Sequence, residues 1–175
     1  MLIVLSDLEM KVATYIGKQR NANDIEAGLV QNKRSSDTGD EINIQGFAAE
    51  LAFCRHFNLF PDYAVEFHGQ IEDCVLQDGR TVDVKQTKYE SGRLIVPIEK
   101  EQKKCDIYYL VTGTMPNFWL RGYATKEEVF RDESIDDLGY GPSYMIEQKN
   151  LHQLEVSPCN TNCSNTTPSP ELKIW

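Results

Sequence analysis

Four side chains in the first half of the chain have the types and spacing that metal-assisted phosphoryl chemistry requires. They are Glu50, Asp73, Asp83 and Lys85. Carboxylate oxygens are hard ligands that suit Mg²⁺ or Mn²⁺, and such an ion keeps several waters and binds substrate phosphates. The ion can activate water and orient a leaving group, and a lysine within reach can stabilise the developing charge. These residue types predict an acidic metal site beside a lysine.

A hairpin is expected to bring three of these residues together. Asp78-Gly79 lies between two β-rich runs, which is typical of a hairpin turn. A two-residue loop would turn Asp73 and Asp83 to opposite sides of the sheet. A three-residue loop over 77–79 pairs them and separates apolar from polar side chains more cleanly, so we favour it. It also puts Lys85 on the same face, and two opposed aspartates then require a cation.

Glu50 belongs to a helix that we expect over residues 43–58. On a helical wheel it falls on the apolar side, where its neighbours are Phe47, Phe53 and Cys54. A carboxylate in such surroundings must be neutralised, paired or bound to a cation. The ordinary alternative is a glutamate at the helix edge that extends to water. The acids that follow in the sequence favour the cation site.

These motifs resemble a known family. Asp73, followed after a gap by Asp83-Val84-Lys85, is similar to the signature of the PD-(D/E)XK nuclease superfamily. The upstream segment 46–52, Gly-Phe-Ala-Ala-Glu-Leu-Ala, resembles the helix that supplies an extra acid in many members. Gln86-Thr87 and the segment 105–111 also fit the small phage and bacterial members. The resemblance covers roughly residues 42–125.

The resemblance implies an α/β (α+β) fold with a restriction-endonuclease-like core of order αβββαβ, and metal-dependent cleavage of DNA phosphodiester bonds. By motif position, Glu50, Asp73 and Asp83 would bind Mg²⁺ or Mn²⁺, Lys85 would be the catalytic lysine and Gln86 would assist. The sequence departs from the family pattern in having Glu72, where many members have proline, before Asp73. If the register differs, Glu72 or Asp78 replaces Asp73 as the first acid.

The remaining sequence predicts one domain over residues 1–156 that positions these groups in a mixed sheet. Capping boxes at Ser6–Glu9 and Thr125–Glu128 mark two helix starts. Residues 157–175 are rich in Ser, Thr, Asn and Pro and are expected to form a disordered tail. We expect helices over 7–19, 43–58, 97–104 and 125–131, strands at 93–96, 107–111 and 118–123 beside the hairpin, a polar segment over 21–41, a loop-like segment over 132–150, and a last strand or short helix over 151–156.

The charge of the chain is segregated. The 175 residues carry 18 basic and 27 acidic side chains, a formal net charge of −9, which argues against coating nucleic acid by bulk charge. Residues 35–78 hold one basic and nine acidic groups, whereas 79–104 hold seven basic and four acidic ones. This pattern favours an acidic metal pocket beside a basic track for DNA phosphates, although solvated faces give the same pattern by chance. Candidate phosphate contacts are Lys88, Arg93, Lys100, Lys103 and Lys104, with Lys33 and Arg34 able to close over a substrate.

Other features bound the location and the partners. No run approaches the ~18 apolar residues of a membrane span, residues 1–5 are too short for a signal peptide, and five cysteines are an odd number. We therefore expect thiols, no membrane partner and the cytoplasm of a bacterial or phage-infected cell. The leading hypothesis is a Mg²⁺-dependent nuclease that acts on DNA, and the resemblance allows a homodimer, since many relatives act as dimers. The alternative is a non-catalytic phage interaction or anti-defence protein that keeps the fold and binds a protein partner.

Overall fold

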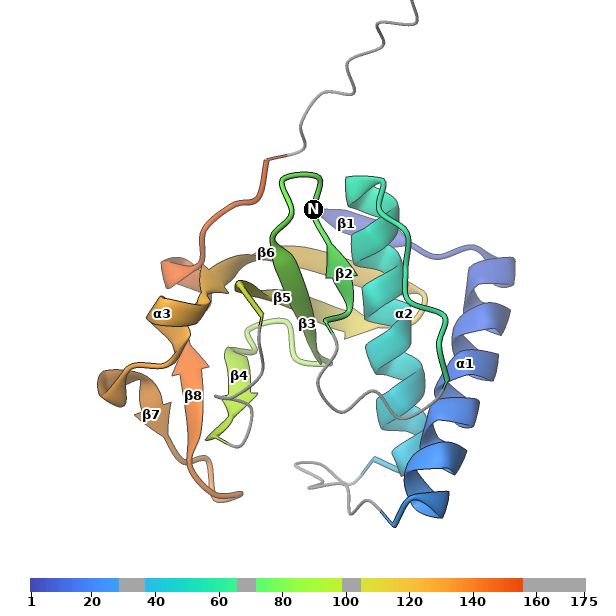
Figure 1. The fold of residues 1–175 in the computed structure, drawn as a ribbon, viewed down its shortest axis with the longest axis horizontal. Helices are drawn as coiled ribbons and strands as arrows, with labels where there is room; N and C mark the ends of the chain where they lie inside the picture. Colours follow the sequence, from blue (N-terminus) through green and yellow to red (C-terminus); the bar gives the residue numbers. More distant parts are fainter. Residues whose placement is uncertain (29–36, 66–71, 99–104, 156–175) are drawn as a thin grey trace, which may run out of the picture.

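The strand that carries Asp83 and Lys85 lies inside a mixed sheet. The computed structural model describes residues 1–28, 37–65, 72–98 and 105–155. Within these residues five strands form a sheet of order β1-β6-β5-β3-β2 (Figure 1). Their bounds are β1 Leu2–Val4, β2 Cys74–Val75, β3 Thr81–Thr87, β5 Ile107–Thr114 and β6 Asn117–Thr125. Only the β3–β5 pair is parallel among the described pairs, which confirms the expected mixed α/β class.

The β2–β3 hairpin has the three-residue register that the sequence favoured. Cys74 pairs with Val82 and Val75 with Thr81, so the same register sets Asp73 across from Asp83. The Leu76 amide donates to the Arg80 carbonyl at 2.8 Å. Gly79 closes the loop with φ of 89°, a conformation that glycine adopts without steric cost. The expected apolar face, Cys74, Leu76, Val82 and Val84, is buried in the core.

Two long helices cover this apolar face. α1 (Asp7–Glu26) begins at the predicted Ser6–Glu9 capping box but continues seven residues beyond the expected end. α2 (Gly39–Phe57) begins four residues earlier than expected, because Thr38 and Glu41 form a capping box of their own. α2 lies between α1 and the sheet (Figure 1), and Ala49 and Ala52 of α2 are fully buried.

A second, smaller layer covers the other face of the sheet. β4 (Leu94–Pro97), β8 (Ser143–Ile146) and β7 (Ile135–Asp136) form a three-stranded sheet in the described part of the chain. Buried residues of β4, β8 and α3 (Lys126–Val129) pack against Tyr108 and Leu110 of β5 and form a second core. The expectation of a loop over 132–150 is wrong, since this segment holds β7, β8 and two 3₁₀ turns, Asp132–Ser134 and Gln148–Asn150.

Several smaller expectations are also corrected. Pro97 ends strand β4, where the sequence had suggested the start of a helix. The α3 capping box at Thr125 is confirmed, but the helix ends at Val129. In place of the last strand or short helix predicted over 151–156, the described residues show an isolated β-bridge between Tyr123 and His152. The remainder of the expected helix over 99–104 and the tail over 157–175 lie outside the described residues.

Two further findings bear on the chemistry of the chain. The described cysteines, Cys54, Cys74 and Cys105, are buried free thiols, as expected. Within the described ranges, no helix has the length and apolar character needed to cross a membrane.

The close approach of α1 and α2 gives a stability prediction. A Cβ atom at Gly17 would lie 2.5 Å from the Ile44 Cα and 2.6 Å from its amide nitrogen, both backbone atoms. We expect Gly17→Ala to lower the free energy of unfolding by about 1–3 kcal/mol, because the helices must separate. Gly46→Ala is the matched control, since a Cβ there meets nothing within 4 Å. It should raise stability by about 0.5–1 kcal/mol, and equal effects of the two substitutions in urea unfolding would contradict the prediction.

Candidate active site

The four residues singled out by type and spacing meet where the β2–β3 hairpin passes α2. Asp83 and Lys85 lie on β3, Asp73 immediately precedes β2, and Glu50 lies on α2. Glu50 and Asp83 are buried, with 8% and 1% of their surface exposed, and Asp73 is half-buried. The charges of Asp73 and Asp83 both act on Glu50, which places the three carboxylates within electrostatic reach of one another.

The carboxylates approach from the two sides of the sheet. Val82 and Val84 face the helices, so Asp83 between them faces the other layer, beside Tyr108. Glu50 comes from the helical side, and Asp73 acts on it more strongly than Asp83 does. The acids therefore gather at the sheet edge, where β2 is only two residues long.

Glu50 is paired with an arginine that sequence analysis missed. Arg20 of α1 donates from Nη1 to both Glu50 carboxylate oxygens, at 3.1 and 3.0 Å. Its other donors reach the carbonyls of Ala64 at 3.1 Å and Asp62 at 2.8 Å, and its guanidinium lies 4.7 Å from the centre of the Phe47 ring. No local pattern marks Arg20, since its partner is thirty residues away. Only the requirement that a buried Glu50 be paired could have indicated that such a cation exists.

The surroundings of Glu50 favour its protonated form. Burial raises the pKa of Glu50, the charge of Asp73 raises it further, and Arg20 opposes both effects. The balance brings the pKa to about 8. Glu50 is thus a carboxyl group that can exchange a proton near neutral pH, which is the property that acid–base and metal-binding sites use.

The other two acids also have partners. The Lys85 ammonium donates to Asp83 Oδ1 from the same face of β3. The Asp73 carboxylate accepts a hydrogen bond from the Val84 amide at 2.6 Å, and so takes the place of a backbone carbonyl where the ladder ends. Among the described residues, no three His, Cys, Asp or Glu side chains have the spacing of a metal site. The donor set suits a hard divalent cation in kind, but such an ion would have to compete with Arg20 and Lys85.

Three further predicted site residues are the alternative first acids Asp78 and Glu72 and the assisting residue Gln86. Asp78 lies in the exposed hairpin turn and pairs with Arg80 at 2.8 Å, so it does not join the other acids. Glu72 is half-buried next to Asp73. The Gln86 side chain donates to the Gly113 carbonyl of β5 at 2.7 Å, which ties it to the sheet.

A cleft of about 840 Å³ opens beside Lys85. Lys88 and Arg93, two predicted phosphate contacts, line it. Lys88 pairs with Asp37 at 2.9 Å, and Arg93 pairs with Asp136 at 3.0 Å and Glu147 at 2.8 Å. The other predicted contacts, Lys33, Arg34, Lys100, Lys103 and Lys104, lie outside the described residues.

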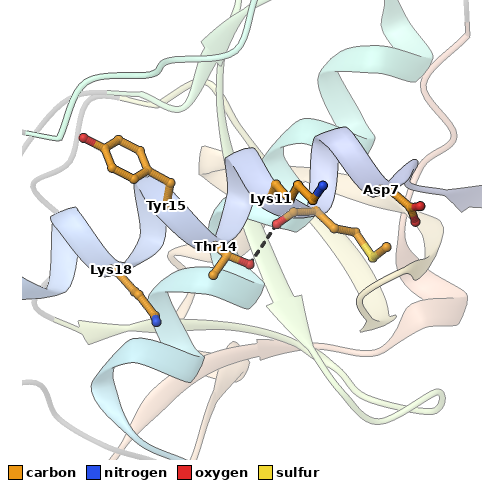
Figure 2. A pocket seen from close by; sticks show the side chains of 6 residues that line it. Asp7, Lys11, Thr14, Tyr15 and Lys18 are labelled. Carbon is orange, nitrogen blue, oxygen red and sulfur yellow. Dashed lines mark hydrogen bonds between the residues drawn. The ribbon is translucent and has the colours of Figure 1, made fainter.

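A second hollow, of about 510 Å³, lies on the outer surface of α1 (Figure 2). Asp7, Lys11, Tyr15 and Lys18 line it, and the Thr14 hydroxyl beneath them donates to the Met10 carbonyl at 2.8 Å. None of the clustered acids contributes to it. Its tyrosine and lysines therefore provide matched controls for those of the cleft.

The raised pKa of Glu50 predicts a pH-dependent stability. Between about 4.5 and 8 the folded protein holds a proton on Glu50 that the unfolded chain releases, so the free energy of unfolding should fall as pH rises through this window. One such group contributes at most about 1.4 kcal/mol per pH unit. Urea unfolding of wild type and Glu50→Gln from pH 5 to 8 should show a stability difference that increasingly favours the variant.

Glu41→Gln is the control for this measurement. Glu41 lies on the same helix, and hydrogen bonds from Thr38 lower its pKa, so it titrates below the window. The control should keep the wild-type slope. Parallel stability profiles of wild type and Glu50→Gln would show that the Glu50 pKa is not raised.

Comparison with known proteins gives a family but no activity. No curated protein matches the chain. Residues 1–114 match the model of a family of unknown function (DUF5843), and this span holds Arg20, Glu50, Asp73, Asp83 and Lys85. The match covers more than half of the sequence, and the chain therefore belongs to this family.

Proposed function

We propose that the protein is a divalent-metal-dependent nuclease that hydrolyses DNA phosphodiester bonds. One observation carries the proposal: the hairpin register sets Asp73 across from Asp83, with Lys85 on the same face of β3 and a buried Glu50 within electrostatic reach. Burying like charges near one another destabilises a fold, and such arrangements are typical of functional sites. The cleft beside Lys85 would bring a substrate to the lysine of this cluster, whereas the three acids are not among the residues that line it.

The fold is compatible with a restriction-endonuclease-like core. A helix, α2, precedes the β2–β3 hairpin, and the chain then crosses to β5, which lies parallel to β3. A helix followed by two strands agrees with the start of the αβββαβ order that the resemblance implies, whereas the next strand, β4, belongs to the other sheet. These first elements support the proposed core and leave its remaining elements as part of the proposal.

The chain's own residues would divide the work by chemistry. Asp73 and Asp83, with Glu50, would hold Mg²⁺ or Mn²⁺ once their carboxylates converge on it, and the ion would supply Lewis-acid activation of the scissile phosphate and of a water. Lys85 lines the cleft, where its ammonium can donate to a phosphate oxygen as charge develops. Arg20 holds Glu50 in place from α1. Gln86 would assist as a positioning residue, because its side-chain amide donates a hydrogen bond to β5 and so fixes the end of β3.

A non-catalytic binding protein is the second candidate, and the ion pairs are what favour it. Arg20 pairs with Glu50 and Lys85 pairs with Asp83 in the described structure, so two of the acids already have basic partners without a metal. A net charge of −9 also suits a protein partner better than DNA. In this case the cluster would serve the fold alone.

A cleavage assay tests the nuclease. Supercoiled plasmid and single-stranded DNA are incubated with the protein in Mg²⁺, Mn²⁺ or EDTA. We expect metal-dependent cleavage that falls by at least about 100-fold in Asp83→Asn, which loses a metal ligand, and in Lys85→Ala, which loses the cation at the reacting phosphate. Asp73→Asn should fall likewise if Asp73 is the first acid.

Two substitutions control this assay. Asp78→Asn alters the exposed turn of the same hairpin, and Lys11→Ala alters an exposed lysine of α1. Both should keep wild-type cleavage. Absence of divalent-dependent cleavage of any DNA form by the folded protein would refute the nuclease and favour the binding protein.

Thermal unfolding separates the two candidates without a substrate. A cation that binds the folded state alone stabilises it by about 2.7 kcal/mol at one hundred times its Kd, or about 5 °C or more in Tm for a chain of this size. We expect Mn²⁺ to give such a shift in wild type and in Asp78→Asn, and none in Asp73→Asn. Equal shifts in all three proteins would place metal binding elsewhere.

A further inference from the structure

The cleft begins at the candidate catalytic lysine. Lys85, Gln86 and Thr87 at the end of β3 line it, and so do Lys88 and Tyr89, which follow directly. Its other walls come from α2, β4, β8 and the segment between β7 and β8. A ligand in the cleft would therefore contact elements of both layers and Lys85 at once.

Large exposed side chains gather in this cleft. Tyr89 is 64% exposed and Tyr140 62%, and Leu138 beside them is 54% exposed. Single exposed apolar residues are ordinary, but several that line one concave site indicate a binding surface. The two rings come from different segments of the chain, so they offer two separate flat surfaces.

Hydrogen bonds hold the backbone of both tyrosines in place. The Gly92 amide donates to the Tyr89 carbonyl at 3.0 Å, and a Cβ at Gly92 would lie 2.4 Å from the Thr87 side chain, so this turn is tight. Asp137 accepts hydrogen bonds from the Tyr140 amide at 3.1 Å and from those of Gly139 and Gly141 on either side of it. Exposed rings on fixed turns lose little entropy when they bind.

The charges of the cleft differ from those of the whole chain. Its charged lining residues are three basic, Lys85, Lys88 and Arg93, and two acidic, Asp37 and Glu41, in a protein of net charge −9. Lys88 forms one ion pair and Arg93 forms two, but all three pairs are at least about one-third exposed, and such pairs exchange for a phosphate at small cost. The cleft thus accepts a few phosphates without being strongly basic.

This combination suits nucleic acid whose bases are unpaired. A duplex keeps its bases stacked inside, so aromatic side chains in a cleft can stack only on bases that are free. A volume of about 840 Å³ is that of a small-molecule pocket, which encloses a short unpaired stretch and not a double helix.

We propose that the cleft binds unpaired DNA, with Tyr89 and Tyr140 stacking on bases and Lys88 and Arg93 contacting phosphates, so that the backbone reaches Lys85. The inference rests on the proposed nuclease function and specifies the form of its substrate.

Binding in EDTA tests this inference apart from cleavage. The probes are a fluorescent 20-nucleotide single strand of mixed sequence, the same strand in a duplex, and an RNA of the same sequence, followed by anisotropy. We expect the single-stranded DNA to bind at least about tenfold more tightly than the duplex. Tyr89→Ala and Tyr140→Ala should each weaken binding about fivefold or more, while Tyr89→Phe, which keeps the ring, should bind as wild type does.

The α1 surface supplies matched controls. Tyr15 is 64% exposed, as Tyr89 is, and Lys11 lies beside it outside the cleft (Figure 2). Tyr15→Ala and Lys11→Ala should bind as wild type does. Lys88→Ala should weaken binding and reduce the slope of log affinity against log salt by about 0.7, the value for one phosphate contact on a single strand.

The outcomes separate the two proposals. Equal affinity for duplex and single strand, or wild-type affinity in both tyrosine-to-alanine variants, would overturn the inference even if metal-dependent cleavage of duplex DNA were found. Tighter binding of the RNA would overturn the assignment to DNA. Tyrosine-dependent binding of single-stranded DNA without cleavage in any metal would sustain the inference about the cleft and refute the nuclease.

Discussion

Electrostatic repulsion among buried carboxylates is the constraint on which the rest of this structure depends. Asp73 and Asp83 both act on Glu50 in surroundings that exclude much of the solvent, where a charged carboxylate loses hydration. Removal of a partner from such a group is far more costly than the loss of a surface ion pair. The fold must therefore deliver a donor or a cation to every one of these acids.

The elements around the site follow from that requirement. α1 extends far enough to carry Arg20 to Glu50, and the same guanidinium fixes the carbonyls of Asp62 and Ala64. Asn23, nearly one turn further along α1, donates to the Val65 carbonyl at 2.6 Å and adds a second anchor. The segment that leads from α2 toward the hairpin is thus held by the residues that compensate the acid. The contacts that Arg20 makes from α1 therefore hold this segment and position Glu50 at the same time.

The sequence was informative where a pattern was local. The hairpin register could be predicted because only one register puts Cys74, Leu76, Val82 and Val84 on one face. Two capping boxes, at Ser6 and Thr125, gave correct helix starts, and a third at Thr38, with Glu41 three residues later, carried the same signal and was overlooked.

What could not be predicted depends on contacts between distant residues. β8 is four residues long, and its strand character comes from pairing with β4, nearly fifty residues earlier. The partnership of Arg20 with Glu50 and the burial of Ala49 and Ala52 both require α1 to lie across α2. The sequence does not predict the cleft, because Tyr89 lies in a segment with no predicted element and Tyr140 in a segment predicted to be a loop.

The net charge of −9 limits the ways in which this protein could bind nucleic acid. Counterion release favours binding by proteins that neutralise many phosphates. A cleft with three basic and two acidic lining residues gains little affinity from this effect. Long-range attraction is weak for the same reason, so affinity has to come from contacts made at close range. Exposed aromatic rings on fixed turns provide such contacts, and they act only on bases that a duplex would hide. An acidic chain of this kind would therefore select its substrate by whether the bases are accessible, and would leave bulk DNA unbound.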